Sequence, residues 1–425
     1  MAVARIADVH GRRVWDSRGR PTVEVEVTLE DGVTGRAIAP AGASRGSGEA
    51  VDLRDGGAAF GGLDVQRAIA NVNAEIAPAL RSRNALDQAD VDQTLIQLDG
   101  TPNKARIGGN AMIAASMAVL HAAAAAQRLP LWRHLAEGGP VTIPLPEIQI
   151  FGGGAHAARR VDIQDFMVVC PNAASFAEAL DRTAEVYRAA GEILKTRGRF
   201  QGVADEGGYW PAFDSNEEAL GTLVEAIERA GFVPGSDIAI SLDVAASEFG
   251  QGGRYRLALE GRELDRDAMV ELLGTWLASY PIVSIEDPLA EDDQEGFRLF
   301  TQSFGDRVQI IGDDFLVTNA ERVGRAAAMG ACNAVLIKTN QAGTITETRA
   351  ALDRAKAEGF GTIVSARSGE TEDVTIAHLA VGWNAGQLKV GSFARSERMA
   401  KWNEILRIEE ALGRATILSS PFRSR

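Results

Sequence analysis

The feature that most constrains the fold is a series of short apolar segments, rich in Ile and Val, that each run into a charged residue. These charged residues are Asp243, Glu286, Asp313, Lys338, Arg367 and Lys389. Such a segment is typical of a parallel strand buried on both faces. The charged ends recur roughly every 25 residues, the spacing of strands that alternate with helices in an eightfold (β/α) barrel. Because these barrels keep their chemistry at the carboxyl ends of the strands, we expect the six side chains to meet at one mouth.

Three of these side chains, Asp243, Glu286 and Asp313, are carboxylates. In a low-dielectric cleft they would repel one another unless they were protonated, paired or neutralised by a cation. A hard dication is the simplest solution, and a set of oxygen ligands without Cys or His favours Mg²⁺ over Zn²⁺. The sequence therefore predicts a magnesium site formed by these three residues.

Two lysines, Lys338 and Lys389, would lie beside the same cation. Repulsion by the metal and desolvation would lower the pKa of each ammonium group, and a neutral lysine can act as a base. This predicts abstraction of a proton α to a carboxylate, with metal ions stabilising the resulting enediolate. Taken singly, such an Asp is usually a helix N-cap and such a Lys is usually solvated surface. Five of them at one barrel spacing favour a functional site.

Composition and charge narrow the class of protein and its partners. The 425 residues are 45% hydrophobic and 24% charged, which is typical of a globular protein with a large core. The net charge of −14 argues against nucleic acid and anionic membrane as partners, whereas a local cluster of cations can still bind an anionic substrate. Cys170 and Cys332 lie in apolar segments, so we expect no disulfide and a reducing compartment. The N-terminus carries no signal-peptide pattern, and we expect a cytoplasmic protein.

The remaining pattern predicts the elements around the barrel. The first 40 residues alternate apolar and polar positions, which indicates an antiparallel meander with strands at 22–29 and 33–38. A loop of small residues at 39–50 has the freedom to move over a ligand, although such loops are often only connectors. Helices are predicted at 65–81, 88–98, 109–127, 175–197 and 395–412, the Ala-rich third of them packed closely on a neighbour, and the first barrel strands at 144–151 and 162–169. An acid, Glu206, follows a further strand, and the tail 413–425 should lie on the surface.

Longer motifs occur along nearly the whole chain. In order they are Asp16-Ser-Arg-Gly-Arg-Pro-Thr-Val-Glu-Val-Glu, Asn103-Lys-Ala-Arg-Ile-Gly-Gly-Asn-Ala, Asp205-Glu-Gly-Gly, Ser284-Ile-Glu-Asp-Pro, Gly312-Asp-Asp, Ser365-Ala-Arg-Ser-Gly-Glu-Thr-Glu-Asp and Ala394-Arg-Ser-Glu-Arg. Together these motifs resemble the enolase (phosphopyruvate hydratase) family. The resemblance implies an α/β fold with an enolase-type modified (β/α)8 barrel at 139–425 and a small α+β N-terminal capping domain at 1–138. The barrel would open with two antiparallel-paired strands and two helices before six βα units. Mg²⁺ dependence and a homodimer, with higher assembly left open, are also implied.

The resemblance also assigns roles residue by residue. Asp243, Glu286 and Asp313 match the family's metal ligands, in agreement with the pattern of strand ends. Lys338 matches the base that takes the C2 proton, and Glu206, with Asp165 beside it, matches the acid that protonates the departing C3 hydroxyl. The implied substrate-binding residues are His156, Gln164, Arg367, Ser368, Lys389, Ser44 and Arg45, with Arg367 and Ser368 at the phosphate and Lys389 near the carboxylate.

The chain departs from the family's pattern on the phosphate and loop side of the site. The substituted positions are Ala41 for Ser, Arg45 for Thr, Gly48 for a larger residue, Gly152 for Asn, Asp165 for Glu and Ala366 for His. Shorter side chains at 165 and 366 would enlarge the site, whereas Arg45 would add a permanently charged donor. Extra room together with an extra cation indicates an extra anionic group on the ligand.

Three functional hypotheses follow. The leading one is a Mg²⁺-dependent carbon–oxygen lyase that removes the C2 proton of 2-phosphoglycerate or a close analogue and eliminates the C3 substituent, giving phosphoenolpyruvate or an enolpyruvyl product. The second is an enzyme resembling carboxyphosphonoenolpyruvate synthase, of phosphonate and phosphinate antibiotic biosynthesis. The third is a non-catalytic enolase scaffold that serves as a binding protein, which the intact carboxylates and lysines argue against. The substrate in both catalytic cases is a small phosphorylated or phosphonylated anion.

Overall fold

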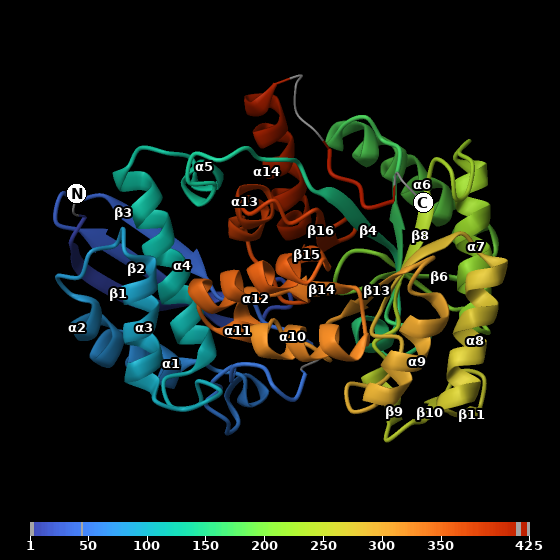
Figure 1. Ribbon diagram of the computed structural model, residues 1–425, viewed down its shortest axis with the longest axis horizontal. Coiled ribbons are helices and arrows are strands. Elements are labelled where there is room, and N and C mark those ends of the chain that lie inside the picture. Colours follow the sequence, from blue (N-terminus) through green and yellow to red (C-terminus); the bar gives the residue numbers. More distant parts are fainter. Residues whose placement is uncertain (1–3, 44–45, 414–417, 423–425) are drawn as a thin grey trace.

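The computed structural model describes residues 4–43, 46–413 and 418–422 of the chain. It consists of a small N-terminal domain beside a closed barrel of eight strands, with the helices of the barrel on its outside (Figure 1). This confirms the fold class predicted from the strand spacing and from the family resemblance. The predicted boundary at residue 138 falls in the connection between α5 and β4 and stays a prediction.

The N-terminal domain is an antiparallel meander covered by helices. Its strands are β1 (Ile6–Trp15), β2 (Pro21–Leu29) and β3 (Thr34–Ile38), and its helices are η1 (Ala59–Gly62), α1 (Gln66–Asn71), the π-helical η2 (Val72–Ile76), α2 (Ala77–Leu80), α3 (Gln88–Asp99), α4 (Gly109–Ala126) and α5 (Leu131–Leu135). The helix predicted at 65–81 therefore exists, with a π-helical stretch in its middle.

Helix α4 packs closely on β2 and β3, as its alanine content predicts. A Cβ atom at Gly35 of β3 would lie 2.1 Å from the backbone nitrogen of Ala122, so only glycine permits this approach. Within the described part of the chain, α4 is the one helix long and apolar enough to cross a membrane, and 83% of it is buried inside the protein. It is thus placed as a core helix.

The barrel is closed by pairing of its first and last strands. Its strands are β4 (Leu145–Gly152), β5 (Asp165–Val169), β8 (Ala239–Asp243), β12 (Ile282–Glu286), β13 (Gln309–Gly312), β14 (Ala334–Ile337), β15 (Gly361–Ser365) and β16 (Gln387–Gly391). Strand β5 is antiparallel to both neighbours, whereas the other neighbouring pairs, including β16 with β4, are parallel. The opening pair of antiparallel strands is therefore confirmed.

Helices follow the strands in the expected order. They are α6 (Phe176–Thr196), α7 (Asn216–Arg229), α8 (Arg266–Ser279), α9 (Gln294–Phe304), α10 (Ala320–Met329), α11 (Thr339–Ala342), α12 (Ile345–Ala357), α13 (Thr375–Gly382) and α14 (Ser396–Leu412), with short turns η3 (Gly154–Ala157) and η4 (Ala246–Glu248). Ser, Asp, Asn or Thr side chains cap many of their N-termini, for example Ser175 at α6 and Asn319 at α10. These caps satisfy backbone N–H groups that have no partner within the helix.

Two smaller β elements lie outside the barrel ring. Strands β6 (Phe200–Val203) and β7 (Tyr209–Pro211) form a hairpin that pairs with the end of β4, and β9 (Gly250–Gln251), β10 (Arg254–Leu257) and β11 (Arg262–Asp265) form a separate antiparallel sheet. Glu206 lies in the turn between β6 and β7, so it reaches the site from a hairpin and not from a barrel strand.

Alternate residues of the barrel strands share the interior of the barrel. On one side, Ile311, Ala334, Leu336 and Ile363 form a separate apolar cluster. Elsewhere the interior is polar: Ser284 Oγ lies 3.1 Å from Gln309 Oε1, and Gln309 Nε2 donates to Gln387 Oε1 at 2.7 Å. Because side chains two residues apart face the same way, Glu286 and Lys389 lie above Ser284 and Gln387 on the same strands. The charged layer therefore stands on a layer of hydrogen-bonded side chains.

One local expectation was wrong and another was right only in part. Strand β5 begins at Asp165 and not at Asp162, because the Asp162 carboxylate accepts backbone N–H groups of a neighbouring loop, including that of Ala258 at 2.8 Å. In the described part of the tail, Gly413 and Pro421 are exposed as expected, whereas Leu418 and Phe422 are buried and Ser419 N donates to Ile143 O at 2.8 Å.

Both cysteines, Cys170 and Cys332, are buried and free, as predicted. Burial raises the pKa of the Cys170 thiol to about 11, so it stays protonated at neutral pH. The thiols therefore act as small apolar groups of the core.

A buried carboxylate joins the two domains. Asp92 of α3 accepts hydrogen bonds from Ser116 Oγ of α4 at 2.6 Å and from Gln88 Nε2 at 3.0 Å. Its other oxygen accepts from the backbone nitrogen and the hydroxyl of Thr346, at 2.8 and 2.6 Å, in the first turn of α12. A carboxylate at the N-terminus of a helix satisfies its free N–H groups and complements its dipole.

Replacing Asp92 with Ala should lower the free energy of unfolding by about 2 kcal/mol, because it leaves buried donors without acceptors. Urea denaturation followed by circular dichroism measures this loss. Asp90→Ala is the matched control, since Asp90 lies on the same helix with a half-exposed side chain paired to Arg83. It should cost about 0.5 kcal/mol or less. Equal losses in the two variants would show that the Asp92 network adds nothing.

Candidate active site

A cavity opens at the carboxyl ends of the barrel strands. It is lined by His156, Gln164, Asp165, Glu206, Asp243, Lys338, Ser365, Ala366, Arg367, Ser368, Lys389 and Val390. Predicted site residues from distant parts of the sequence therefore meet in one pocket. Glu286 and Asp313 are bonded to its lysines. Ser44 and Arg45, predicted to bind substrate, lie outside the described residues.

Each lysine of the site is held by carboxylates from other strands of the barrel. Lys389 Nζ lies 2.8 Å from Asp243 Oδ2, 2.8 Å from Glu286 Oε2 and 3.5 Å from Asp165 Oδ2. Lys338 Nζ lies 2.5 Å from Asp313 Oδ2. All these side chains are buried, so each charge is neutralised within a region of low dielectric constant.

The lysine pKa values run opposite to the expectation from the sequence. Burial alone would lower the pKa of Lys338, but the nearby carboxylates, Asp313 and then Glu286, together outweigh burial and raise it. Burial is likewise outweighed at Lys389, where Asp243 and Glu286 raise the pKa well above its ordinary value. The expectation counted a dication among the neighbours, whereas these shifts come from the protein groups alone. With only the protein groups as neighbours, both lysines are cations at neutral pH.

The carboxylates retain oxygens that suit a cation. Asp243 Oδ1 and Glu286 Oε1 are buried and have no hydrogen-bond partner among the described residues. An orphaned buried carboxylate oxygen is costly unless a proton or a metal ion satisfies it. The donors are oxygens only, which suits Mg²⁺. The residues present therefore fit the predicted metal, with Asp243 and Glu286 offering these oxygens and Asp313 following directly after β13.

Two tighter groups of possible ligands are also present. One is Asp287, Asp313 and Asp314, whose ligand atoms lie within 4.8 Å of one another, and the other is His156, Asp165 and Glu206. Asp287 accepts the backbone N–H groups of Asp313 and Asp314 at 2.9 and 2.8 Å through its two oxygens. This fixes the turn that presents Asp313. We therefore assign Asp287 to positioning, a role that sequence analysis missed although it follows Glu286 directly.

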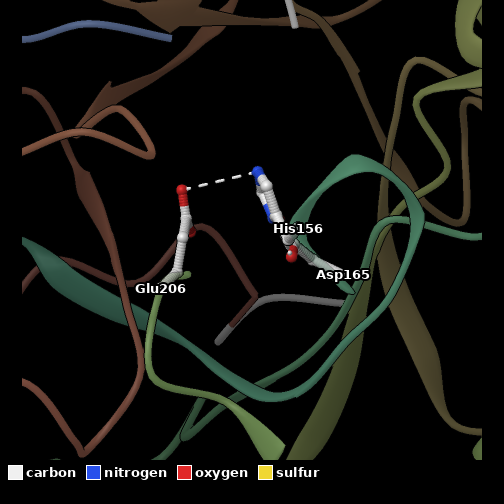
Figure 2. Close-up of side chains that lie close together, drawn as sticks. All are labelled: His156, Asp165 and Glu206. Carbon is white, nitrogen blue, oxygen red and sulfur yellow. Dashed lines mark hydrogen bonds and ion pairs between the residues drawn. The ribbon is translucent and has the colours of Figure 1, made fainter. Parts of the chain in front are cut away.

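His156 lies between the two carboxylates of the second group (Figure 2). Its Nδ1 is 3.1 Å from Asp165 Oδ1, and its Nε2 is 3.7 Å from Glu206 Oε1 and 3.1 Å from Ser368 Oγ. Asp165 also accepts from Gln149 Nε2, and Gly208 N donates to Gln149 Oε1 at 2.8 Å. Asp165 thus contacts the imidazole and not Glu206 directly, so the shorter carboxylate holds the ring.

The His156 imidazole should stay protonated well above neutral pH. Burial would lower its pKa, but the carboxylates of Glu206 and Asp165 outweigh burial and raise it to about 9. Because this folded pKa exceeds the ordinary value, the stabilisation is complete below about pH 6.5 and is lost as the pH rises through about 9. An NMR titration of the ring nitrogens should find this midpoint, and Asp165→Asn should lower it. The exposed Asp181→Asn should leave it unchanged; a midpoint near 6.5 in the parent protein would contradict the assignment.

The loop after β15 is clamped by both domains. Arg398 of α14, which is fully buried, donates to the carbonyls of Arg367 at 2.7 Å and Ser368 at 2.6 Å. From the N-terminal domain, Ser17 N donates to Glu370 O at 2.8 Å, and Ala41 and Gly369 exchange backbone hydrogen bonds. The motif around Asp16 therefore helps to fix the predicted phosphate contacts.

One of the departures from the family pattern has a packing reason. A Cβ at Gly152 would lie 2.6 Å from the Cβ of Ala204, so a larger residue there would need space that Ala204 fills. At Gly48 the nearest atom to a Cβ is Nη2 of Arg322, at the flexible end of that side chain. Ala366, by contrast, lines the cavity with its methyl group.

Sequence analysis missed further polar residues that contact predicted site residues. Glu49 and Asn340 bind the guanidinium of Arg367, and Gln341 Nε2 donates to Asp313 Oδ1 at 2.9 Å. Asn340 and Gln341 lie two and three residues after Lys338, which is the one signal that could have found them. Glu49 lies 318 residues from Arg367 in the chain, and no local pattern joins the two.

Comparison with known proteins agrees with this arrangement. The enolase C-terminal TIM barrel domain model matches residues 140–421, and the enolase N-terminal domain model matches residues 6–135. A relative named Enolase 1, from Desulfitobacterium hafniense (strain Y51), is 52% identical over 412 residues, which cover 96% of this chain and 94% of the relative. The chain therefore belongs to the enolase family and is a lyase of the enolase type.

Proposed function

We propose that the protein is a Mg²⁺-dependent lyase that removes the C2 proton of 2-phosphoglycerate or a close analogue and eliminates the C3 substituent to give phosphoenolpyruvate or an enolpyruvyl product. The observation that carries the proposal is the placement of Lys338, Lys389 and Glu206 around one cavity that also contains Arg367 and Ser368. A base, an acid and an anion contact within one small pocket are what an α-proton elimination requires.

Each residue then has a defined task. Lys338 Nζ takes the C2 proton, which requires it to enter the reaction as the neutral amine. Lys389 places a positive charge beside the substrate carboxylate, where negative charge develops. Glu206 gives a proton to the departing C3 oxygen, which requires it to enter the reaction as the carboxylic acid, and His156, held by Asp165, borders the same space. When bound by Asp243, Glu286 and Asp313, Mg²⁺ supplies the positive charge that stabilises the developing anion.

The remaining contacts orient the substrate. Arg367 and Ser368 bind its phosphate, since a guanidinium fork suits a phosphate oxyanion. Gln164 donates to Asp243 Oδ2 at 3.1 Å and lines the cavity, so it orders the carboxylate side of the pocket. The proposed substrate is a small anion, whether it is phosphorylated or phosphonylated.

Product formation tests this function. Purified protein with 2-phosphoglycerate and Mg²⁺ should raise the ultraviolet absorbance of an enolpyruvate, and chelation of the metal should abolish the rise. Absence of turnover on 2-phosphoglycerate and on phosphono analogues alike would reject the elimination.

A second candidate substrate carries a phosphonoformate group, as in the reaction of carboxyphosphonoenolpyruvate synthase. The observation that favours it is that Ala366 lines the cavity next to Arg367, where a short side chain would leave room for an additional anionic group. Under this candidate, Ala366→His should refill that room and lower turnover of the phosphono substrate by about tenfold or more relative to 2-phosphoglycerate. An unchanged ratio of kcat/KM values would favour 2-phosphoglycerate itself.

We also propose that the protein works in the cytoplasm as a homodimer. The exposed apolar pair Trp15 and Phe60, 50% and 46% exposed with ring centroids 5.2 Å apart, supports a contact through the N-terminal domain. Analytical ultracentrifugation should give a mass of twice the 45.1 kDa chain.

A further inference from the structure

Arg367, the proposed phosphate contact, already forms an ion pair with a carboxylate of the chain itself. Glu49 and Arg367 form a two-pronged ion pair, with Oε2 of Glu49 3.0 Å from Nη1 and Oε1 3.2 Å from Nη2. The side chains are only 7% and 4% exposed. Such a fork-to-fork arrangement is the geometry in which arginine binds carboxylates and phosphates.

Glu49 is held in place by groups of the active site. Its Oε1 accepts from the backbone nitrogen of Gly46 at 3.1 Å and from Gln341 Nε2 at 3.3 Å. Gln341 in turn accepts from Thr318 Oγ1 at 2.6 Å, and Thr318 Oγ1 accepts the backbone N–H of Lys338 at 2.9 Å. The carboxylate is therefore built into the hydrogen-bond network that surrounds the predicted base.

The segment that carries Glu49 packs closely on the mouth of the barrel. Ala50 N donates to Gln341 O at 2.9 Å, and Ser47 donates through its backbone nitrogen and hydroxyl to Glu291 Oε2 at 3.0 and 3.1 Å. A Cβ at Gly46 would lie 2.5 Å from Val317 Cγ1, so the backbone itself lies against the barrel. Glu49 is thus delivered to Arg367 by a docked segment and not by a chance side-chain rotamer.

We propose that Glu49 is an internal competitor for Arg367, which a substrate must displace with its own anionic group, and that Glu49 thereby sets the selectivity of the site for strongly charged ligands. This rests on the proposed function, in which Arg367 receives the phosphate or phosphonate. A ligand with one carboxylate gains no more from Arg367 than Glu49 already provides. A dianionic phosphoryl or phosphonyl group gains more charge interaction and a third oxygen, so it displaces Glu49 where a monoanion does not.

The competition can be measured by binding of inorganic phosphate, without any turnover. Calorimetric titration in the presence of Mg²⁺ should give a Kd about tenfold lower, or lower still, for Glu49→Gln than for the parent protein, because the glutamine keeps the acceptor for Gly46 but loses the charge on Arg367. Glu49→Ala, which removes the acceptor altogether, should also tighten binding. Arg367→Gln should abolish binding in either background.

Glu291→Gln is the matched control. It weakens the anchor of Ser47 on the same segment but leaves the pair of Glu49 and Arg367 in place, so its phosphate affinity should equal that of the parent. Equal tightening in Glu291→Gln would overturn the proposal, since loosening of the segment would then be the cause.

Unchanged or weaker phosphate binding in Glu49→Gln would also overturn the proposal, because Glu49 would then hold Arg367 in place for the ligand. Phosphate binding that survives in Arg367→Gln would overturn it by placing the anion elsewhere. None of these results depends on C2 chemistry. A protein that shows the predicted affinities but no turnover would reject the proposed function and leave the competition intact.

Discussion

Replacing Lys338 with Ala should slow exchange of the C2 proton of 2-phosphoglycerate by about 10²- to 10⁴-fold, the range in which a positioned base contributes. Lys338 is buried at the end of β14 and lines the cavity, with its Nζ bonded to Asp313. The variant removes the proton acceptor but none of the proposed metal ligands, so Mg²⁺ affinity should change little. Deuterium incorporation at C2, followed by NMR, measures the exchange, and calorimetry measures the metal.

Lys195→Ala is the control for this substitution, because Lys195 is an exposed lysine of α6 whose Nζ lies over the Phe200 ring, and it lines no part of the cavity. Its exchange rate should match that of the parent protein. Exchange that persists in Lys338→Ala would remove the assignment of Lys338 as the base and direct attention to Lys389.

Replacing Glu286 with Gln should weaken Mg²⁺ binding by about 100-fold or more, which exceeds the usual effect of changing a group that only supports a ligand. Glu286 is fully buried, with one oxygen 2.8 Å from Lys389 Nζ and the other without a partner among the described residues. The substitution keeps the shape but removes the charge, and an amide N–H₂ cannot ligate a metal. Calorimetric titration with Mg²⁺ measures the loss.

Glu295→Gln serves as the comparison, because Glu295 is a half-exposed glutamate of α9 paired with Arg298. Its Mg²⁺ affinity should be that of the parent protein. If Glu286→Gln also binds Mg²⁺ normally, the metal is held elsewhere, with the group of Asp287, Asp313 and Asp314 as the first alternative.

The barrel could be predicted from the sequence because its parallel strands are buried on both faces and end at the functional rim. Burial forces a continuous apolar segment, and function places a charge directly after it, as at Ile285-Glu286 and Ile337-Lys338. Such a pattern is local, so it can be recognised in a single sequence. The boundaries of β5 and the packing of the tail depend instead on contacts with distant loops, such as those of Asp162 and Leu418.

The residues that form the site could be predicted from the sequence, but the contacts between them could not. The strand ends identified Asp243, Asp313 and Lys338, and the motifs added His156, yet nothing local showed that His156 would bridge Asp165 and Glu206. The predicted lowering of the lysine pKa values counted a bound dication and stays a prediction. Among the protein groups alone both pKa values are raised, because each ammonium group lies beside a carboxylate. The electrostatic environment of a side chain depends on distances across the barrel, and the spacing of residues along the sequence does not give these distances.

Deuterium wash-in at C2 of 2-phosphoglycerate, catalysed by the parent protein with Mg²⁺ in heavy water, bears most directly on the function proposed here. The arrangement of Lys338, Lys389 and the three carboxylates predicts rapid incorporation of deuterium at C2 that stops when the metal is chelated. Incorporation with poor formation of phosphoenolpyruvate would keep the proton abstraction and point to a phosphono substrate for the elimination. Absence of incorporation at C2, in a protein that binds Mg²⁺, would contradict the proposed chemistry.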